Sequence, residues 1–449
     1  MAGAIKKYLS LQVPRYTSYP TAPHFSAAID AGRYRTWLEA LDPAQKLSLY
    51  LHIPFCRRLC WYCGCNMRLV ARYDPIAAYV QTLIREIELL ARSLPEAMSV
   101  AHVHWGGGTP NCLSEDYFLR VNEALRRHFN LQAEAEIAVE LDPRILTANR
   151  ARALSRIGCT RASLGVQELD PKVQAAINRI QPLSTIEKPV ELLRGHSIGK
   201  FNFDLMYGLP HQTSQTLKCT IHELARLEPD RVALFGYAHV PWAAKNQRLI
   251  ANEALPTPYM RFQQFQAASE SLVGLGYEPI GLDHFAKPSD RLAMAARSGH
   301  LRRNFQGYTD DRAGSLIGFG ASAISALSQG YVQNLVETGA YTRAVNEGKL
   351  PVAKGLAFKG EDRLRGALIE RLMCNLEADL DQAFAPLAAS PRFGREISEL
   401  QSLAEDKLVE LNGLHIRVTE AGRPFLRVIC ATFDAYLDRS RALRHAIAV

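Results

Sequence analysis

Short strand-like runs alternate with helix-like segments from about residue 47 onward, and this alternation constrains the fold more than any other feature of the chain. Helical periodicity marks, for example, residues 74–94, which open with Asp-Pro, and residues 114–129, which open with Ser. Repeated strand–helix units bury a parallel sheet beneath helices, so the sequence predicts an α/β protein. The strands are expected at residues 47–54, 99–105, 135–143, 161–167, 200–210 and 231–241.

Six such units favour an incomplete (β/α)6 barrel of the TIM type over a doubly wound sheet, because no glycine-rich nucleotide fingerprint follows the first strand. Both folds place their chemistry at the carboxyl ends of the strands. A group of cysteines begins directly after the first strand, within residues 56–65. The sequence therefore predicts that these cysteines lie at the functional end of the barrel.

Length and texture divide the 449 residues into four segments. The strand–helix alternation breaks after residue 288, and a helical texture with a hairpin signal at Asn412-Gly413 begins at about residue 359. We expect an N-terminal segment at 1–46, a partial barrel at 47–288, a loop-rich extension over the barrel mouth at 289–358, and a smaller, mainly helical, winged-helix-like C-terminal domain with a β-hairpin wing at 359–449.

Composition narrows the class of protein. Hydrophobic residues make up 47% and charged residues 22%, which is ordinary for a globular chain. No apolar run is long enough for a membrane span, and the first residues lack a signal-peptide pattern, so a cytoplasmic protein is expected. The formal charge of +8 comes from scattered Lys and Arg without a basic recognition helix. We therefore expect an acidic substrate and no nucleic-acid partner.

Four of the nine cysteines fall within residues 56–65, in the pattern C-x3-C-x2-C-x-C. A structural zinc site needs two separated cysteine pairs or a cysteine–histidine spacing, and neither is present. A thioredoxin-type C-x2-C would have to be the CWYC stretch, which further cysteines flank on both sides. Zinc and thiol–disulfide chemistry are therefore disfavoured.

Three thiolates on one loop, from Cys56, Cys60 and Cys63, can bind three irons of a [4Fe–4S] cluster and leave the fourth iron without a protein ligand. An electron-transfer cluster would be closed by a fourth cysteine, and Cys65 keeps this alternative open. Only Gly64 separates Cys65 from Cys63, which leaves little reach to another corner of the cluster. We expect the first three cysteines to be the metal ligands.

Polar and flexible residues also follow the later strands. Gly107, Gly108 and Thr109 follow the second strand, where backbone without side chains can approach a ligand, although a flexible turn is the simpler alternative. Glu140 and Asp204 lie at strand ends within apolar runs, where an unpaired carboxylate would be costly. Ribose hydroxyls, a sulfonium ion or a neighbouring arginine could each satisfy these acids.

The motif CRRLCWYC at residues 56–63, with GGGTP at residues 106–110, resembles the radical S-adenosylmethionine enzymes. Further matching stretches extend into the C-terminal part; they include PRYTSYPTA (14–22), CGCN (63–66), VELDPR (139–144), DLMYGLP (204–210), YAHVPW (237–242) and NFQGYT (304–309). Together these motifs resemble the oxygen-independent coproporphyrinogen III oxidases.

The resemblance implies a [4Fe–4S] cluster and two molecules of S-adenosylmethionine as cofactors. It places Glu140 at the molecule that binds the cluster, and the remaining polar contacts at the second molecule: Gln167, Arg179 and Asp204. The walls of these sites are expected to be Tyr50, Tyr62, Ala238 and Ile324. Gln306 is expected to approach the tetrapyrrole, and the candidates for binding its propionates are Arg15, Arg302 and Arg303.

The activity implied by the resemblance is the oxidative decarboxylation of two propionates of coproporphyrinogen III to vinyl groups through a 5′-deoxyadenosyl radical. The product would be protoporphyrinogen IX, made by a monomer that works with an unidentified electron donor and acceptor. Two alternatives stay open, namely a haem-binding chaperone that keeps the cluster and a non-catalytic iron–sulfur electron-transfer module. Residues 187–204 carry a Pro inside a predicted helix and depart from the family pattern just ahead of Asp204.

Overall fold

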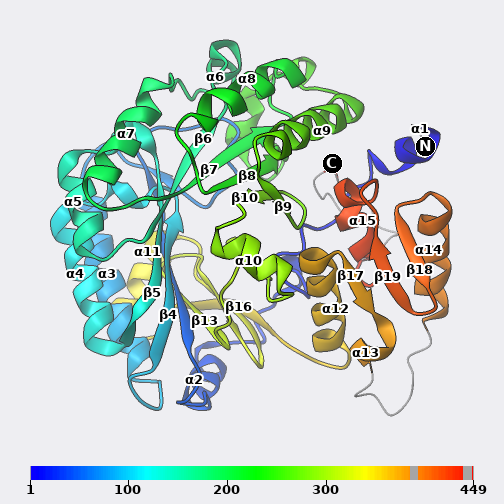
Figure 1. The fold of residues 1–449 in the computed structure, drawn as a ribbon. Coiled ribbons are helices and arrows are strands. Elements are labelled where there is room, and N and C mark those ends of the chain that lie inside the picture. The colour runs from blue at the N-terminus through cyan, green and yellow to red at the C-terminus, as the bar shows by residue number, and fades with distance from the viewer. Residues whose placement is uncertain (1, 385–392, 438–446, 448–449) are drawn as a thin grey trace.

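One twelve-stranded sheet organises the computed structural model, which describes residues 2–384, 393–437 and 447 (Figure 1). Its strand order is β16-β15-β14-β13-β1-β4-β5-β6-β7-β8-β10-β9. The six predicted strands are confirmed as β1 (Leu47–Ile53), β4 (Ser99–Gly107), β5 (Asn130–Leu141), β6 (Arg161–Gln167), β7 (Lys200–Tyr207) and β8 (Arg231–Gly236). They run parallel to one another in this order, as an α/β barrel requires.

Helices cover the outer face of these strands (Figure 1). They are α3 (Asp74–Ala91), α4 (Glu115–His128), α5 (Ala148–Arg156), α6 (Pro171–Ala176), α7 (Ser184–Gly195), α8 (Ser214–Ala225) and α9 (Pro258–Gly274). The predicted Ser at the start of the second helix is its N-cap, because the Ser114 side chain accepts a hydrogen bond from the Tyr117 N–H. None of the described helices is both long and apolar enough to cross a bilayer.

Strand β1 illustrates how the sequence separates core from cavity. Its alternate residues Leu47, Leu49, Leu51 and Ile53 are almost completely buried and belong to the main hydrophobic core, which also contains the apolar face of α3. Because side chains alternate across a strand, the residues between them face the other way, into the barrel. These are Ser48, Tyr50 and His52. The alternation of apolar and polar residues along β1 therefore presents an apolar face to the covering helices and a polar face to the barrel interior.

The sheet is wider than the sequence predicts. Residues 289–358 are expected to be a loop-rich extension, but the structure places six strands and two helices there; they are α10 (Arg291–Arg297), β11 (Arg302–Asn304), β12 (Gly307–Thr309), β13 (Ser315–Phe319), β14 (Ile324–Leu327), β15 (Gly330–Asn334), α11 (Thr338–Asn346) and β16 (Val352–Ala357). Strand β13 pairs in parallel with β1, so a seventh parallel strand joins the six. It is short, contains Gly318 and completes no strand–helix unit, which is why the alternation does not reveal it.

The C-terminal region is mainly helical and carries a small β-sheet, as the sequence predicts. Helices α12 (Asp362–Asn375) and α14 (Gly394–Glu405) accompany a small sheet of β17 (Glu377–Asp379), β18 (Val409–Asn412) and β19 (His415–Val418). The wing turns at Gly413 and Leu414, one residue later than predicted, because Asn412 still pairs with His415; Gly413 takes a φ of +60°, where glycine is favoured. Tyr8, Tyr16 and Tyr19 of the N-terminal segment are buried in the same hydrophobic cluster as α12 and α15 (Leu426–Ala431). The two ends of the chain therefore pack together (Figure 1).

Candidate active site

A cavity of about 520 Å³ lies at the carboxyl ends of the parallel strands, beside the cysteine loop at residues 56–65. We call it the main cavity. Most of the predicted site residues line it; they are Cys56, Cys60, Tyr62, Cys63, Gly107, Gly108, Thr109, Glu140, Gln167, Arg179, Asp204 and Ala238. Segments separated by up to 182 positions, from Cys56 to Ala238, thus meet at one place because parallel strands end at the same rim.

Two predicted wall residues, Tyr50 and Ile324, do not line the main cavity. The Tyr50 hydroxyl lies 3.0 Å from Nδ1 of His52, within the barrel. Ile324 lies on β14, and a Cβ at Gly318 would meet its carbonyl oxygen at 2.7 Å. Because Gly318 pairs with Tyr50 across β1 and β13, these residues form a row beside the cavity.

Each of the three predicted ligand cysteines has a polar neighbour. Sγ of Cys56 lies 3.3 Å from the Thr109 hydroxyl. Sγ of Cys60 accepts hydrogen bonds from Nη1 of Arg179 at 3.3 Å and from Nη2 of Arg144 at 3.6 Å. Two guanidinium groups therefore lie beside this one sulfur.

Cys63 and Cys65 interact directly. The backbone N–H of Cys65 donates to Sγ of Cys63 at 3.4 Å. Hydrogen bonding from the Cys65 thiol is the main cause that lowers the pKa of Cys63 to about 7, and it raises the pKa of Cys65 itself well above the usual value. By contrast, burial raises the pKa of Cys56 to about 12. Cys65 therefore lies beside Cys63 rather than at a separate position in the cavity.

The arrangement of the cysteine loop is compatible with an iron–sulfur cluster. All nine cysteines are free thiols. In the described part of the chain, no group of three or more His, Cys, Asp or Glu side chains converges on a point that could hold one metal ion. A [4Fe–4S] cluster needs no such convergence, because each thiolate binds a different iron. Three thiols that line one cavity without meeting at one point are therefore consistent with a cluster.

The glycines after β4 are required by close contacts within the protein. Gly107 has a φ of +111°, and a Cβ there would lie 2.8 Å from the His52 ring. A Cβ at Gly108 would lie 2.8 Å from the Phe55 carbonyl oxygen. Any side chain would push this turn away from the strand that precedes the cysteine loop. The glycines thus allow the turn to pack closely against the cysteine loop. They also leave the backbone of the turn accessible to a ligand.

The two acids predicted at strand ends are both hydrogen-bonded, but only Glu140 lies near the end of its strand, since Asp204 lies inside β7, three residues before its last residue. Glu140 accepts from the Gly107 N–H at 3.2 Å, and its other oxygen lies 2.9 Å from Nε2 of His104. Asp204 accepts from the Ser163 hydroxyl at 3.1 Å and from the Asn202 amide at 2.8 Å. Loss of solvent around Asp204, reinforced by the negative charge of Glu140, raises the pKa of Asp204 to about 7.

Sequence reasoning missed an ion-pair network at the cavity wall. Asp142 pairs with Arg144 at 2.7 Å and lies 3.9 Å from Nη2 of Arg179. The side chain of Arg179 is only 8% exposed and donates to the Gly165 carbonyl at 2.6 Å. Asp142 and Arg144 belong to the VELDPR motif. The sequence did not reveal their pairing, because an Asp followed by Pro is also a common signal for the start of a helix.

Comparisons with known proteins extend over almost the whole chain. The radical SAM superfamily matches residues 50–224, and the HemN C-terminal domain matches residues 358–425. An oxygen-independent coproporphyrinogen III oxidase of Bradyrhizobium diazoefficiens is 48% identical over 98% of this chain and 97% of its own. The corresponding protein of Paracoccus denitrificans is 42% identical over 95% of this chain and 94% of its own.

The chain belongs to the oxygen-independent coproporphyrinogen III oxidase family. A solved coproporphyrinogen III oxidase (HemN) from Escherichia coli, described as a radical SAM enzyme, superposes with a TM-score of 0.90 at 37% identity. The alignment covers 95% of this chain and all of that one. As a member of the radical SAM superfamily, the protein uses a [4Fe–4S] cluster and S-adenosylmethionine.

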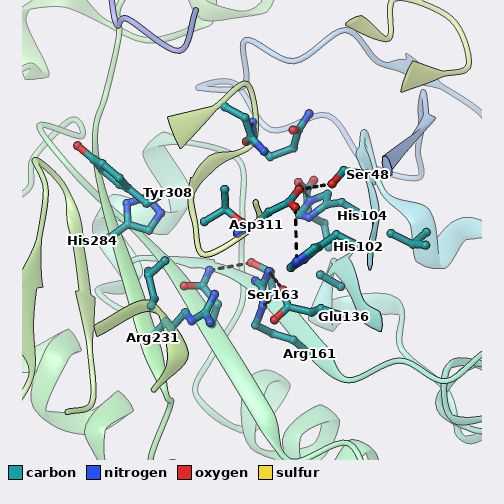
Figure 2. A pocket seen from close by; sticks show the side chains of 18 of the residues that line it. Ser48, His102, His104, Glu136, Arg161, Ser163, Arg231, His284, Tyr308 and Asp311 are labelled. Atoms are coloured by element: carbon teal, nitrogen blue, oxygen red, sulfur yellow. Dashed lines mark hydrogen bonds and ion pairs between the residues drawn. The ribbon is translucent and has the colours of Figure 1, made fainter. Parts of the chain in front are cut away.

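A second polar cavity of about 260 Å³ lies further inside the barrel of this family member (Figure 2). We call it the inner cavity. It shares four lining residues with the main cavity, namely Glu140, Ser163, Asp204 and Phe235. Gln306 lines the inner cavity and not the main one. The expectation that Gln306 approaches the tetrapyrrole thus concerns the deeper part of the barrel.

The three arginines predicted to bind propionates are placed differently. Arg15 lines the main cavity and donates to the Gly236 carbonyl at 3.2 Å. Arg302 forms an ion pair with Glu370 at 2.8 Å, and Arg303 lies 4.4 Å from the centre of the Tyr308 ring. Of the three, Arg15 is therefore the one that the structure brings to the cysteine loop.

Proposed function

We propose that the protein catalyses the oxygen-independent oxidative decarboxylation of two propionates of coproporphyrinogen III to vinyl groups. The product would be protoporphyrinogen IX, an intermediate of haem and porphyrin biosynthesis. The observation that carries this proposal is the extent of the relationship, which covers 98% of the chain at 48% identity and includes segments outside the barrel. A similarity confined to the cysteine loop would support the superfamily but not the substrate.

In this proposal Cys56, Cys60 and Cys63 hold the [4Fe–4S] cluster. A reduced cluster would supply the electron that splits bound S-adenosylmethionine into methionine and a 5′-deoxyadenosyl radical, and this radical would remove a hydrogen atom from the β-carbon of a propionate. The substrate then loses carbon dioxide and one electron to leave a vinyl group. The protein positions the reactants and excludes water, and no side chain is required as a general acid or base.

The main cavity has polar groups for two cofactor molecules. Glu140 and the glycine turn at residues 106–108 lie beside the cysteine loop and would orient the S-adenosylmethionine that binds the cluster. A second group would orient a second molecule; it consists of Gln167, Arg179 and Asp204. The predicted walls remain Tyr50, Tyr62, Ala238 and Ile324. The volume of about 520 Å³ is typical of a small-molecule binding site.

The substrate carries four carboxylates, and of the three predicted arginines Arg15 is the one that lines the main cavity and could meet one of them there. We further propose that the protein acts as a monomer in the cytoplasm. The reaction also needs an electron donor and an electron acceptor, and the identity of both is unknown.

The test is anaerobic reconstitution with iron and sulfide, followed by reductant, S-adenosylmethionine and coproporphyrinogen III. We expect methionine, 5′-deoxyadenosine and a divinyl porphyrinogen, measured by chromatography and mass spectrometry. Cleavage of S-adenosylmethionine without any decarboxylated porphyrinogen would overturn the assigned substrate while leaving the cofactor chemistry in place.

The same samples separate the two alternatives. A haem chaperone would bind haem tightly and leave coproporphyrinogen III unchanged. An electron-transfer module would have all four irons bound by side chains, so its spectrum would not respond to S-adenosylmethionine. A Cys65→Ser variant that keeps a responsive cluster would exclude Cys65 as the fourth ligand.

A further inference from the structure

Two neighbouring amide side chains hold the outer side of the cysteine loop. They lie in the short helix η4 (Lys245–Leu249), which follows β8. Nδ2 of Asn246 lies within hydrogen-bond distance of three carbonyl oxygens of the loop. These are the carbonyls of Cys60 at 3.2 Å, Trp61 at 3.0 Å and Cys63 at 2.8 Å. One amide group thus binds most of the backbone between two predicted cluster ligands.

Gln247 joins the cysteine loop to the opposite wall of the main cavity. Its Nε2 donates to the carbonyl of Tyr62 at 2.8 Å and to that of Ala238 at 3.1 Å. Its Oε1 accepts from the Val240 N–H at 2.6 Å. The residue is only 1% exposed, so these contacts are shielded from water. A movement of the loop relative to β8 would break them.

The orientation of the carbonyls also determines where the peptide N–H groups point. In a trans peptide the N–H points opposite to the C=O, and the bonds between residues 61 and 64 are trans. The carbonyls of Trp61 and Cys63 face Asn246, so the N–H groups of Tyr62 and Gly64 face away from it. Neither N–H makes a hydrogen bond to any part of the chain that the structure describes.

Both of these N–H groups belong to residues that border the main cavity. Tyr62, Cys63 and Gly64 line the main cavity, and Asn246 does not. The loop therefore carries two backbone donors that have no acceptor within the described residues, and both belong to residues that line the main cavity together with the cysteines. Hydrogen bonds from backbone N–H groups to the sulfurs of a cluster help to set its reduction potential and its stability.

We propose that Asn246 and Gln247 are positioning residues for the [4Fe–4S] cluster, because they fix the peptide planes of residues 60–64 so that the Tyr62 and Gly64 N–H groups face the cluster sulfurs. Gln247 also keeps Tyr62 in register with Ala238. This inference rests on the proposed role of Cys56, Cys60 and Cys63 as the cluster ligands.

The test uses the reconstituted full-length protein in the absence of substrate. Asn246→Ala removes the donor, and Asn246→Asp replaces it with an acceptor of the same shape. Gln247→Glu removes the donors to Tyr62 and Ala238. The matched control is Asn149→Asp, the same chemical change on the exposed surface of α5. Three quantities are measured: the rate of iron release to a chelator, the midpoint potential with its electron paramagnetic resonance spectrum, and the thermal midpoint of the apoprotein.

We expect iron release roughly 10-fold faster than wild type in both Asn246 variants, the lower end of what supporting shells of metal sites contribute. The midpoint potential should become more negative in Asn246→Ala, which adds no charge. The apoprotein should unfold at the temperature of the Asn149→Asp control. Iron release and potential equal to the control would overturn the proposal, and so would faster iron release matched by a general loss of apoprotein stability.

These outcomes are distinct from failure of the proposed function. A wild-type protein that takes up no cluster refutes the cofactor assignment. A wild-type protein with a normal cluster and variants identical to it refutes only the role of Asn246 and Gln247.

Discussion

The main cavity and the inner cavity share a boundary but are built from different parts of the chain. The main cavity takes its thiols and open backbone from loops that follow β1 and β4. The inner cavity takes most of its polar groups from the strands themselves, and these groups are bonded to one another (Figure 2). Arg161 pairs with Glu136 at 2.7 Å, and Asp311 binds the Ser48 hydroxyl and lies 3.6 Å from His102.

The difference indicates which cavity is built for chemistry. In the inner cavity the pairing satisfies buried charges, so they stabilise the barrel and are not available to a ligand. The main cavity is instead lined by the three predicted ligand thiols and by the open backbone of the loop at residues 62–64. This division matches the rule that barrel enzymes keep catalysis on the loops after the strands and stability within the barrel.

The largest effect is expected from the cysteine loop. Cys60→Ala should abolish the cluster and all turnover, because two ligands cannot hold the cube against loss of iron. Iron and sulfide per chain after anaerobic reconstitution measure the first loss, and product formation measures the second. Cys219→Ala, on exposed α8, is the control and should keep both. A Cys60→Ala protein that keeps its full iron content would show that this thiol does not bind the cluster. It would then contradict the assignment of chemistry to the main cavity and of stability to the inner one.

The opposite pattern is expected in the inner cavity. Burial alone would raise the pKa of Glu136, but the charges of Arg161 and Arg231 and the bonds from Arg161 hold this pKa well below its usual range. Glu136→Gln leaves Arg161 uncompensated, so the free energy of unfolding should fall by about 3–5 kcal/mol. Urea denaturation of the apoprotein measures it.

The matched control for that change is Glu134→Gln, at an exposed position on the same strand, which should leave stability almost unchanged. Reconstituted Glu136→Gln should bind S-adenosylmethionine as wild type does. Weaker binding with unchanged stability would show that the inner cavity also serves the ligand.

This contrast also explains what could be predicted from sequence. The six barrel strands and the position of the cysteine loop follow from local periodicity, because each strand–helix unit is continuous in the chain. Most of the candidate site follows as well, since acids and glycines at strand ends must converge on one rim. The family resemblance, and not periodicity, is the basis for predicting Gln167, Arg179 and Ala238 as site residues.

Long-range pairings carry no such local signal. Strand β13 pairs with β1 across 268 positions, as from Leu49 to Ile317, and it has no strand–helix unit of its own. The pair Ser48–Asp311 and the amides at Asn246 and Gln247 depend on chain segments that only the folded barrel brings together. A single asparagine in a loop cannot be told from a solvated one until its acceptors are known.

Asp204 lies on the boundary between the cavities and should make stability depend on pH. Its pKa of about 7 in the folded protein exceeds the usual 3.8, so the folded state holds the proton more tightly than the unfolded state does. The contribution is fully present below pH 3.8 and is lost as the pH rises through 7. Between pH 5 and pH 8, Asp204→Asn should gain about 2–3 kcal/mol relative to wild type.

Urea denaturation of the apoprotein at the two pH values measures this gain. Asp116→Asn, at an exposed carboxylate on α4, is the control and should show no such change. A constant difference between Asp204→Asn and wild type at both pH values would mean that Asp204 is ionised throughout, and that the boundary between the cavities is wet.

The smallest effect is expected at the rim of the main cavity. Glu140→Gln keeps an acceptor for the Gly107 N–H but removes the negative charge that a cationic S-adenosylmethionine would meet. A hydrogen bond to a charged group contributes about 1.5–3 kcal/mol, so the dissociation constant should rise roughly 10-fold. Calorimetry on the reconstituted protein measures it, with Glu136→Gln as the buried comparison. The two glutamates stand four residues apart on one strand, and only the one at the strand end should affect the ligand. Equal affinities in both variants would place the binding determinants of the main cavity in its backbone and its arginines instead.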